Sequence, residues 1–144
     1  DAALINILDY LNLYNVPIFV YFSLNLPGED DAAFEETLDL AKRIYNHYPP
    51  SLLKILNSCH TMDPFSPMQQ HPEKFGIDAA WSTFMDFYAY GRETQLRSPG
   101  ARTGAWRGFS LEDEGIRSLK RMADAWDEAR QGREASWWPL PPSW

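Results

Sequence analysis

Residues 16–26 read VPIFVYFSLNL, and this stretch decides the fold class of the 144-residue chain. β-Branched and aromatic side chains dominate it, and it ends at the turn-forming pair Pro27-Gly28, so the pattern predicts a β-strand. Alternate residues from Val16 to Leu26 form one unbroken apolar face. The other face becomes polar toward its carboxyl end and consists of Phe19, Tyr21, Ser23 and Asn25. A strand buried on both faces, with polar groups at that end, is typical of a parallel barrel.

Helical patterns flank this strand on both sides. Apolar residues recur at three- and four-residue intervals over residues 2–14 and again from Phe34 to about Tyr45, where Asp30 or Asp31 offers the N-cap. A second strand is predicted over residues 52–58 (LLKILNS), and which of its faces is buried stays open. The order helix, strand, helix, strand predicts α/β units with a parallel sheet and right-handed crossovers.

The second half of the chain predicts mainly helices. Asp78 is expected to cap a helix that carries Trp81 and Phe84, and a further helix ends at Gly132. The proline- and tryptophan-rich tail, residues 136–144 (SWWPLPPSW), would expose much apolar surface if it were free, so we expect it to dock. The sequence thus predicts a barrel portion over residues 1–76 and a helical extension with an aromatic tail over residues 77–144.

Composition excludes several classes of protein. The chain has 13 basic and 20 acidic residues and a net charge of −7, which argues against a nucleic-acid-binding surface. Its single cysteine, Cys59, excludes an internal disulfide framework, and its three histidines show no ligand spacing, so no metal site is expected. It contains neither an apolar run of about 20 residues nor a basic-then-apolar signal segment, which favours a cytoplasmic protein away from membranes. Because it opens at Asp1 inside a predicted helix, we expect a fragment of a longer polypeptide.

Three motifs in order resemble a known family. They are the turn Leu26-Pro27-Gly28-Glu29, the helix FEETLDLA at residues 34–41, and the loop DPFSPM at residues 63–68, which continues into HPEKFGI at residues 71–77. Over about residues 1–90 the chain resembles the later half of a radical S-adenosylmethionine (radical SAM) barrel, most closely the cobalamin-dependent branch. One departure is visible, because Asn25 stands where the family usually has glycine.

The resemblance implies a fold, an activity and cofactors. The fold would be the distal part of a TIM-like (β/α) radical SAM barrel followed by an α-helical extension. The whole enzyme would use a 4Fe–4S cluster, S-adenosylmethionine and cobalamin, and would pass a methyl group to a carbon centre of a small-molecule or natural-product substrate. The family's Cys-x3-Cys-x2-Cys cluster loop is not in this sequence, so its partner would be the missing N-terminal part of the same enzyme.

Candidate site residues lie near the carboxyl ends of the two strands, where barrel enzymes bind their ligands. Tyr21 is predicted to touch substrate as a hydrogen-bond donor or proton acceptor, and Ser23 and Asn25 to line the pocket over the cofactor. The alternative is that all three are packed polar residues of a barrel interior.

The second strand and its loop supply the other candidates. His60 is the candidate acid–base group, because histidine titrates near neutrality, and Asn57 and Asp63 are candidate substrate-binding residues. His60 and Asp63 could equally brace a loop. Glu29 could bind a substrate amine, but the sequence favours a role in tethering loop amides or the N-terminus of the following helix.

Two other functions stay open. The chain could be a non-catalytic α/β binding module whose aromatic tail docks a partner, or a radical SAM relative with another reaction, such as ring formation. A half-barrel would expose open sheet edges and associate or need its missing half, whereas a complete module would stay soluble and melt cooperatively.

Overall fold

The computed structural model describes residues 2–24, 26–59, 63–76, 82–89 and 113–139, which form a mixed α/β structure, as predicted. In chain order the elements are α1 (Ala2–Leu13), β1 (Ile18–Leu24), α2 (Asp31–His47), a 3-10 turn (Pro50–Leu52), β2 (Leu53–Cys59), α3 (Pro67–Gln70), a second 3-10 turn (Pro72–Phe75) and α5 (Asp113–Arg130). Residues 84–89 are also helical.

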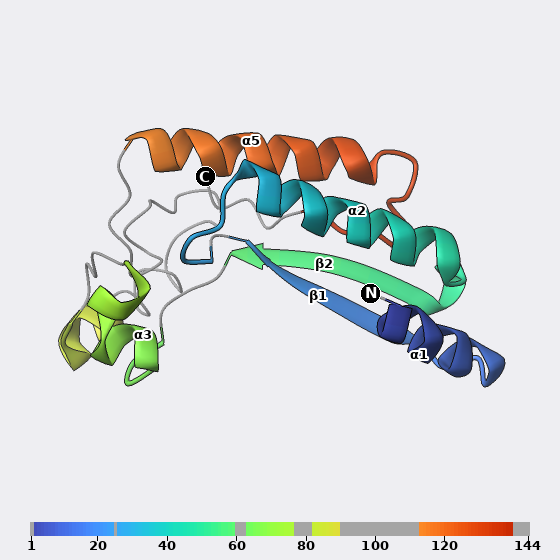
Figure 1. Ribbon diagram of the computed structural model, residues 1–144, viewed down its shortest axis with the longest axis horizontal. Coiled ribbons are helices and arrows are strands. Elements are labelled where there is room, and N and C mark those ends of the chain that lie inside the picture. Colours follow the sequence, from blue (N-terminus) through green and yellow to red (C-terminus); the bar gives the residue numbers. More distant parts are fainter. Residues whose placement is uncertain (1, 25, 60–62, 77–81, 90–112, 140–144) are drawn as a thin grey trace.

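The two strands pair in parallel, which confirms the predicted sheet. Their register runs from Ile18 opposite Leu53 to Leu24 opposite Cys59. α2 connects the end of β1 to the start of β2 and lies on the near side of the sheet in Figure 1, so the crossover is right-handed. Asp30 is the N-cap of α2, because its side chain accepts a hydrogen bond of 2.9 Å from the backbone N–H of Ala33.

The start of the tail adds a short third strand segment to this sheet. The N–H of Ile55 donates to the carbonyl of Ser136 at 2.7 Å, and the N–H of Trp138 donates to the carbonyl of Ile55 at 2.9 Å. The backbone N–H and C=O of Ile55 point to the same side of β2. Residues 136–138 therefore lie on the edge of β2 that faces away from β1, and they run parallel to β2. The order of strands in the sheet therefore follows their order in the chain.

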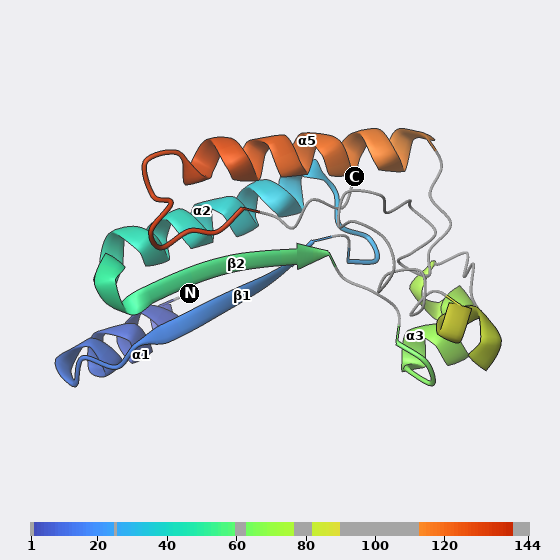
Figure 2. The same ribbon diagram turned by 180° about the vertical axis from the view of Figure 1, so that it is seen from behind.

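The described long helices all cover one face of the sheet. α1, α2 and α5 lie on the near side in Figure 1, and Figure 2 shows the strands from the uncovered side. Burial agrees, because Ile18, Val20, Phe22 and Leu24 face the helices while the residues between them are exposed. The buried core that results consists of Leu8, Leu24, Phe34, Leu38, Ala41, Ile44, Tyr48, Leu53, Ile55, Met122, Trp126 and Trp137.

The prediction that β1 is buried on both faces is wrong for this chain. Phe19 is 57% and Tyr21 is 69% exposed, because the three helices pack on the opposite face. An aromatic strand with one uncovered face is unusual for a parallel sheet, whose strands are normally buried on both sides. We call the uncovered side, formed by Phe19, Tyr21 and Ser23 of β1 and Lys54 and Leu56 of β2, the bare face.

The predicted boundary after residue 76 does not divide the core. Trp126 of α5 is fully buried, and its ring packs against Trp137 at 5.0 Å and edge-on against Phe22 at 6.1 Å. Arg121 of α5 also contacts Asp31 of α2 at 3.1 Å. α5 and residues 136–138 therefore complete the same core as α2 and the strands. The expected docking of the tail is confirmed for residues 136–138, and it takes place within the chain.

Two described stretches of the segment between β2 and α5 are α-helical. The loop that carries the motif at residues 63–68 contains the short helix α3, because Ser66 caps it and Pro67 occupies its first turn. The helical residues 84–89 begin after Thr83, and both Asp78 and Trp81 of the predicted helix lie outside the described residues. The cap is a box in which Asp86 Oδ2 accepts from the N–H of Thr83 at 2.8 Å and Thr83 Oγ1 accepts from the N–H of Asp86 at 3.3 Å.

This cap predicts a measurable pH dependence. Hydrogen bonds from the backbone of Thr83, the backbone of Ser82 and the hydroxyl of Thr83 lower the pKa of Asp86. The cap is therefore fully formed above the pKa of an unfolded aspartate and is lost as the pH falls through the lower folded pKa. In an NMR titration we expect the Asp86 carboxyl to titrate below the ordinary aspartate value. Thr83→Ala removes a donor and should move that midpoint upward; a midpoint that does not move contradicts the cap.

Candidate functional site

Tyr21 and Ser23 lie together on the bare face, in the carboxyl-terminal half of β1. In the parallel register they stand opposite Leu56 and Ser58, and side chains two residues apart on a strand point to the same side. The ring of Phe19 stacks on that of Tyr21, with centroids 6.4 Å apart and planes inclined by 21°. The structure thus places the hydroxyls of Tyr21 and Ser23 beside the exposed ring of Phe19, a combination that can bind and orient a partly apolar ligand.

The sequence candidates beyond β1 and β2 are only partly accessible to description. Asn25 and His60 lie outside the described residues, so their predicted roles stay predictions. Asp63 is exposed, and its backbone carbonyl accepts from the N–H of Ser66 at 3.2 Å in the turn that leads to α3. The role of Asp63 in substrate binding therefore stays a prediction.

Asn57 lies apart from Tyr21 and Ser23, on the helix-covered face. It stands opposite Phe22, and alternation along β2 turns its side chain toward the core, where it is 2% exposed. A common pocket wall of Asn57 with Tyr21 is therefore ruled out by the register. Neither Asn57 Oδ1 nor Asn57 Nδ2 has a hydrogen-bond partner among the described residues, which is costly for a buried amide.

Glu29 has the tethering role that the sequence favoured. Its Oε2 accepts from the N–H of Leu26 at 3.2 Å, and its own N–H donates to the Leu26 carbonyl at 3.0 Å. Gly28 closes this turn with a φ of 80°, a backbone conformation that residues other than glycine rarely adopt. Glu29 and Gly28 therefore close the turn that precedes α2.

Sequence reasoning missed two residues at the margin of the bare face. Lys54 Nζ donates to the carbonyl of Ala135 and lies 5.9 Å from the centre of the Trp138 ring. Trp138 is 42% exposed beside the fully buried Trp137, as alternation along a strand requires. The pairing joins residues more than 80 positions apart in the sequence, so no local pattern could have indicated it.

Comparison with known proteins adds no relative. No family model, curated protein or solved structure matches the chain. A link to a family therefore depends on the motifs of the sequence and on the topology of the sheet.

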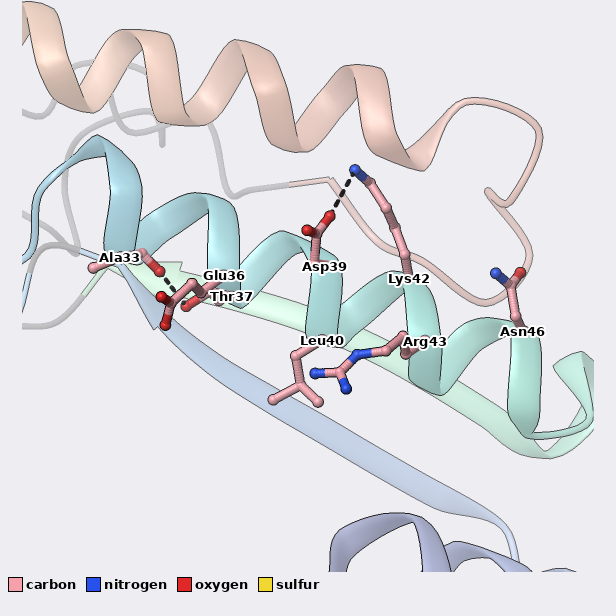
Figure 3. A pocket seen from close by; sticks show the side chains of 8 residues that line it. All are labelled: Ala33, Glu36, Thr37, Asp39, Leu40, Lys42, Arg43 and Asn46. Carbon is pink, nitrogen blue, oxygen red and sulfur yellow. Dashed lines mark hydrogen bonds and ion pairs between the residues drawn. The ribbon is translucent and has the colours of Figure 1, made fainter. Parts of the chain in front are cut away.

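A shallow pocket on the helix layer offers less chemistry than the bare face. Figure 3 shows that the eight side chains around it all come from α2. Asp39 and Lys42 form an ion pair at 3.4 Å, and the Thr37 hydroxyl donates to the Ala33 carbonyl at 3.2 Å. These polar groups satisfy one another on one helix surface, so the arrangement does not indicate a catalytic centre. The lining residues are Ala33, Glu36, Thr37, Asp39, Leu40, Lys42, Arg43 and Asn46.

The described ranges lack two further kinds of feature. There, no group of three or more histidine, cysteine, aspartate or glutamate side chains is placed to hold a metal ion. The helices in those ranges also include none with the length and apolar character needed to cross a membrane.

Proposed function

We propose that this chain forms part of the wall of a parallel (β/α) barrel in a cobalamin-dependent radical SAM methyltransferase that acts on a carbon centre of a small molecule. The winding of the sheet carries the proposal. β1, β2 and residues 136–138 follow one another in chain order, and α1, α2 and α5 all lie on one face. A barrel is wound in this single sense, whereas a doubly wound sheet has helices on both faces.

The bare face would be the chamber side of that wall. A barrel puts its helices outside and lines its interior with the opposite face of every strand. In this arrangement the Tyr21 and Ser23 hydroxyls would hydrogen-bond to substrate or cofactor. Phe19, Leu56 and Trp138 would exclude water and supply apolar contact. The motifs at residues 26–29, 34–41 and 63–68 supply the family assignment.

The cofactors implied by the resemblance fit this chain only in part. A 4Fe–4S cluster needs several thiolates, and Cys59 is the chain's only cysteine, so the cluster ligands would come from another part of the enzyme. S-adenosylmethionine and cobalamin would supply the methyl-transfer chemistry when bound. The residues of this chain would contribute position, hydrogen bonds and a dry surface.

The structure disfavours a module whose tail grips a partner. Trp137, the natural anchor of such a tail, is fully buried in the chain's own core, where its ring packs at a tilt against the rings of Trp126 and Tyr45. The tail's aromatic surface is therefore partly used within the chain.

Substitution of Tyr21 tests the proposed function. In the longer polypeptide that this proposal implies, reconstituted without oxygen with cluster, S-adenosylmethionine and cobalamin, we expect formation of a methylated product. Tyr21→Phe removes one hydroxyl and should lower turnover by about tenfold or more, with unchanged iron and cobalamin content. Tyr88→Phe, at an exposed tyrosine of the helical residues 84–89, is the control. If turnover is equal in both variants, Tyr21 does not belong to the site. If the product carries no new methyl group, the enzyme catalyses a radical reaction other than methyl transfer.

A further inference from the structure

The outer edge of β1 carries backbone groups that no strand of the described segments uses. In a parallel sheet, residues in register point their N–H and C=O groups the same way. Those of Ile55 point away from β1 to residues 136–138, so those of its register partner Val20 point toward β2. The neighbouring residues Phe19, Tyr21 and Ser23 therefore point their backbone groups to the outer edge. A sheet edge of this kind is a template for another strand.

The position of α1 indicates which kind of strand belongs there. α2 joins β1 to β2, and α5 precedes residues 136–138, so each helix leads into the next strand along the sheet. α1 leads into β1 and lies at the β1 side of the same helix layer (Figures 1 and 2). It thus occupies the place of a crossover helix whose preceding strand would lie beside the outer edge of β1, parallel to it.

The surface next to this edge is apolar on both layers. Phe19 and Tyr21 are exposed on the bare face. Ile7 and Tyr10 of α1 are 56% and 61% exposed, and Tyr14, directly after α1, is 66% exposed. Tyr10 and Tyr14 form a ring pair at 5.2 Å. Exposed apolar surface that borders an open strand edge is typical of an interface with another layer of the same kind.

We propose that the outer edge of β1 is the docking site of a further strand, parallel to β1 and leading into α1. This inference rests on the proposed function and names the partner segment. The strand is a β-rich segment of the same polypeptide, buried on the helix side and facing the chamber on the other side. Its backbone pairs with Phe19, Tyr21 and Ser23, and the helix that precedes it covers the exposed side of α1.

Fusion of an additional strand to the chain tests whether the outer edge of β1 binds a strand, and the experiment needs no cofactor. The probe is a second copy of residues 16–30, placed directly before Ala2 of the full chain, because this strand and turn already lead into a helix on the same face. The control carries a glycine–serine extension of equal length. Amide exchange is followed by NMR, with Val20 and Phe22 of the original β1 as reporters of the intact β1–β2 pair.

We expect the added strand to slow exchange at the original Tyr21 and Ser23 amides by about tenfold or more relative to the glycine–serine control. Tyr21→Pro in the original β1 removes an edge-facing N–H and should return the Ser23 amide to the fast rate while Phe22 stays protected. Equal exchange of the edge amides in the probe and the control overturns the proposal.

A second measurement covers the case in which the fused chain loses protection at Val20 and Phe22 and so does not fold. Sedimentation of the original chain should then show concentration-dependent association that Tyr21→Pro suppresses. A chain that stays monomeric, or a variant that associates equally, overturns the proposal. Neither readout involves methyl transfer, so the docking of a strand and the proposed methyl-transfer function can be refuted independently of each other.

Discussion

Trp137→Ala is expected to lower the free energy of unfolding of this chain by about 3–5 kcal/mol, the usual cost of removing a large aromatic core residue. Trp137 is fully buried, and its ring packs against Trp126 at 5.0 Å and Tyr45 at 6.4 Å. Arg133 also lies over this ring at 6.0 Å. Since a domain of this size is stable by about 5–15 kcal/mol, the loss is a large fraction of the total. Urea unfolding followed by circular dichroism measures it.

The neighbouring tryptophan provides a matched control. Trp138 is 42% exposed, and its contributions to the sheet and to Trp126 come from its backbone N–H and C=O, which alanine keeps. Trp138→Ala should therefore cost about 1 kcal/mol or less, the loss of a partly exposed ring and its contact with Lys54. Similar losses in the two variants would mean that the tail does not dock through Trp137.

Asn57→Val is expected to stabilise the chain, by about 1–3 kcal/mol, although it removes a polar residue. The amide of Asn57 is 2% exposed and has no partner among the described residues, so it is desolvated without compensation. Valine suits a strand and has no polar group to satisfy. The same urea measurement gives the change, at unchanged dependence on denaturant.

Asn57→Asp reverses the sign of this change. The aspartate has nearly the same shape but buries a carboxyl group, which should destabilise the chain increasingly as the pH rises and the group ionises. If valine destabilises the chain and aspartate is tolerated, Asn57 is paired with a polar partner and its place in the core is functional. That result would restore Asn57 as a candidate ligand-binding residue, but on the helix side of the sheet.

Much of the local structure could be predicted from the sequence, because its causes are local. The β-branched and aromatic run at residues 16–26 contains β1, and the cap at Asp30 and the proline pair at residues 49–50 delimit α2. The stripe Phe34, Leu38, Ala41 and Ile44 is buried as its spacing requires. Parallel pairing followed from the alternation of helix and strand.

Which face of the second strand is buried could not be predicted from the sequence, for a physical reason. In LLKILNS both alternating sets contain leucine and a polar residue, so periodicity does not distinguish them. Packing selects the buried face of β2. Leu53 and Ile55 are buried against the helices, and because side chains alternate along a strand, Asn57 lies on the same side. The sequence therefore predicted that Tyr21 and Ser23 share one strand face, but not that Asn57 lies on the opposite face of the sheet.

What the sequence by itself determined is the set of elements and their order, since propensity, capping and apolar spacing act over a few residues. Only the tertiary structure decided that residues 136–138 join the edge of β2, that Trp137 completes the core, and that Lys54 meets Trp138. Those contacts join segments about 80 residues apart. Their partners are selected by shape, burial and open backbone groups when the chain is folded, and none of these has a signature in a short stretch of sequence.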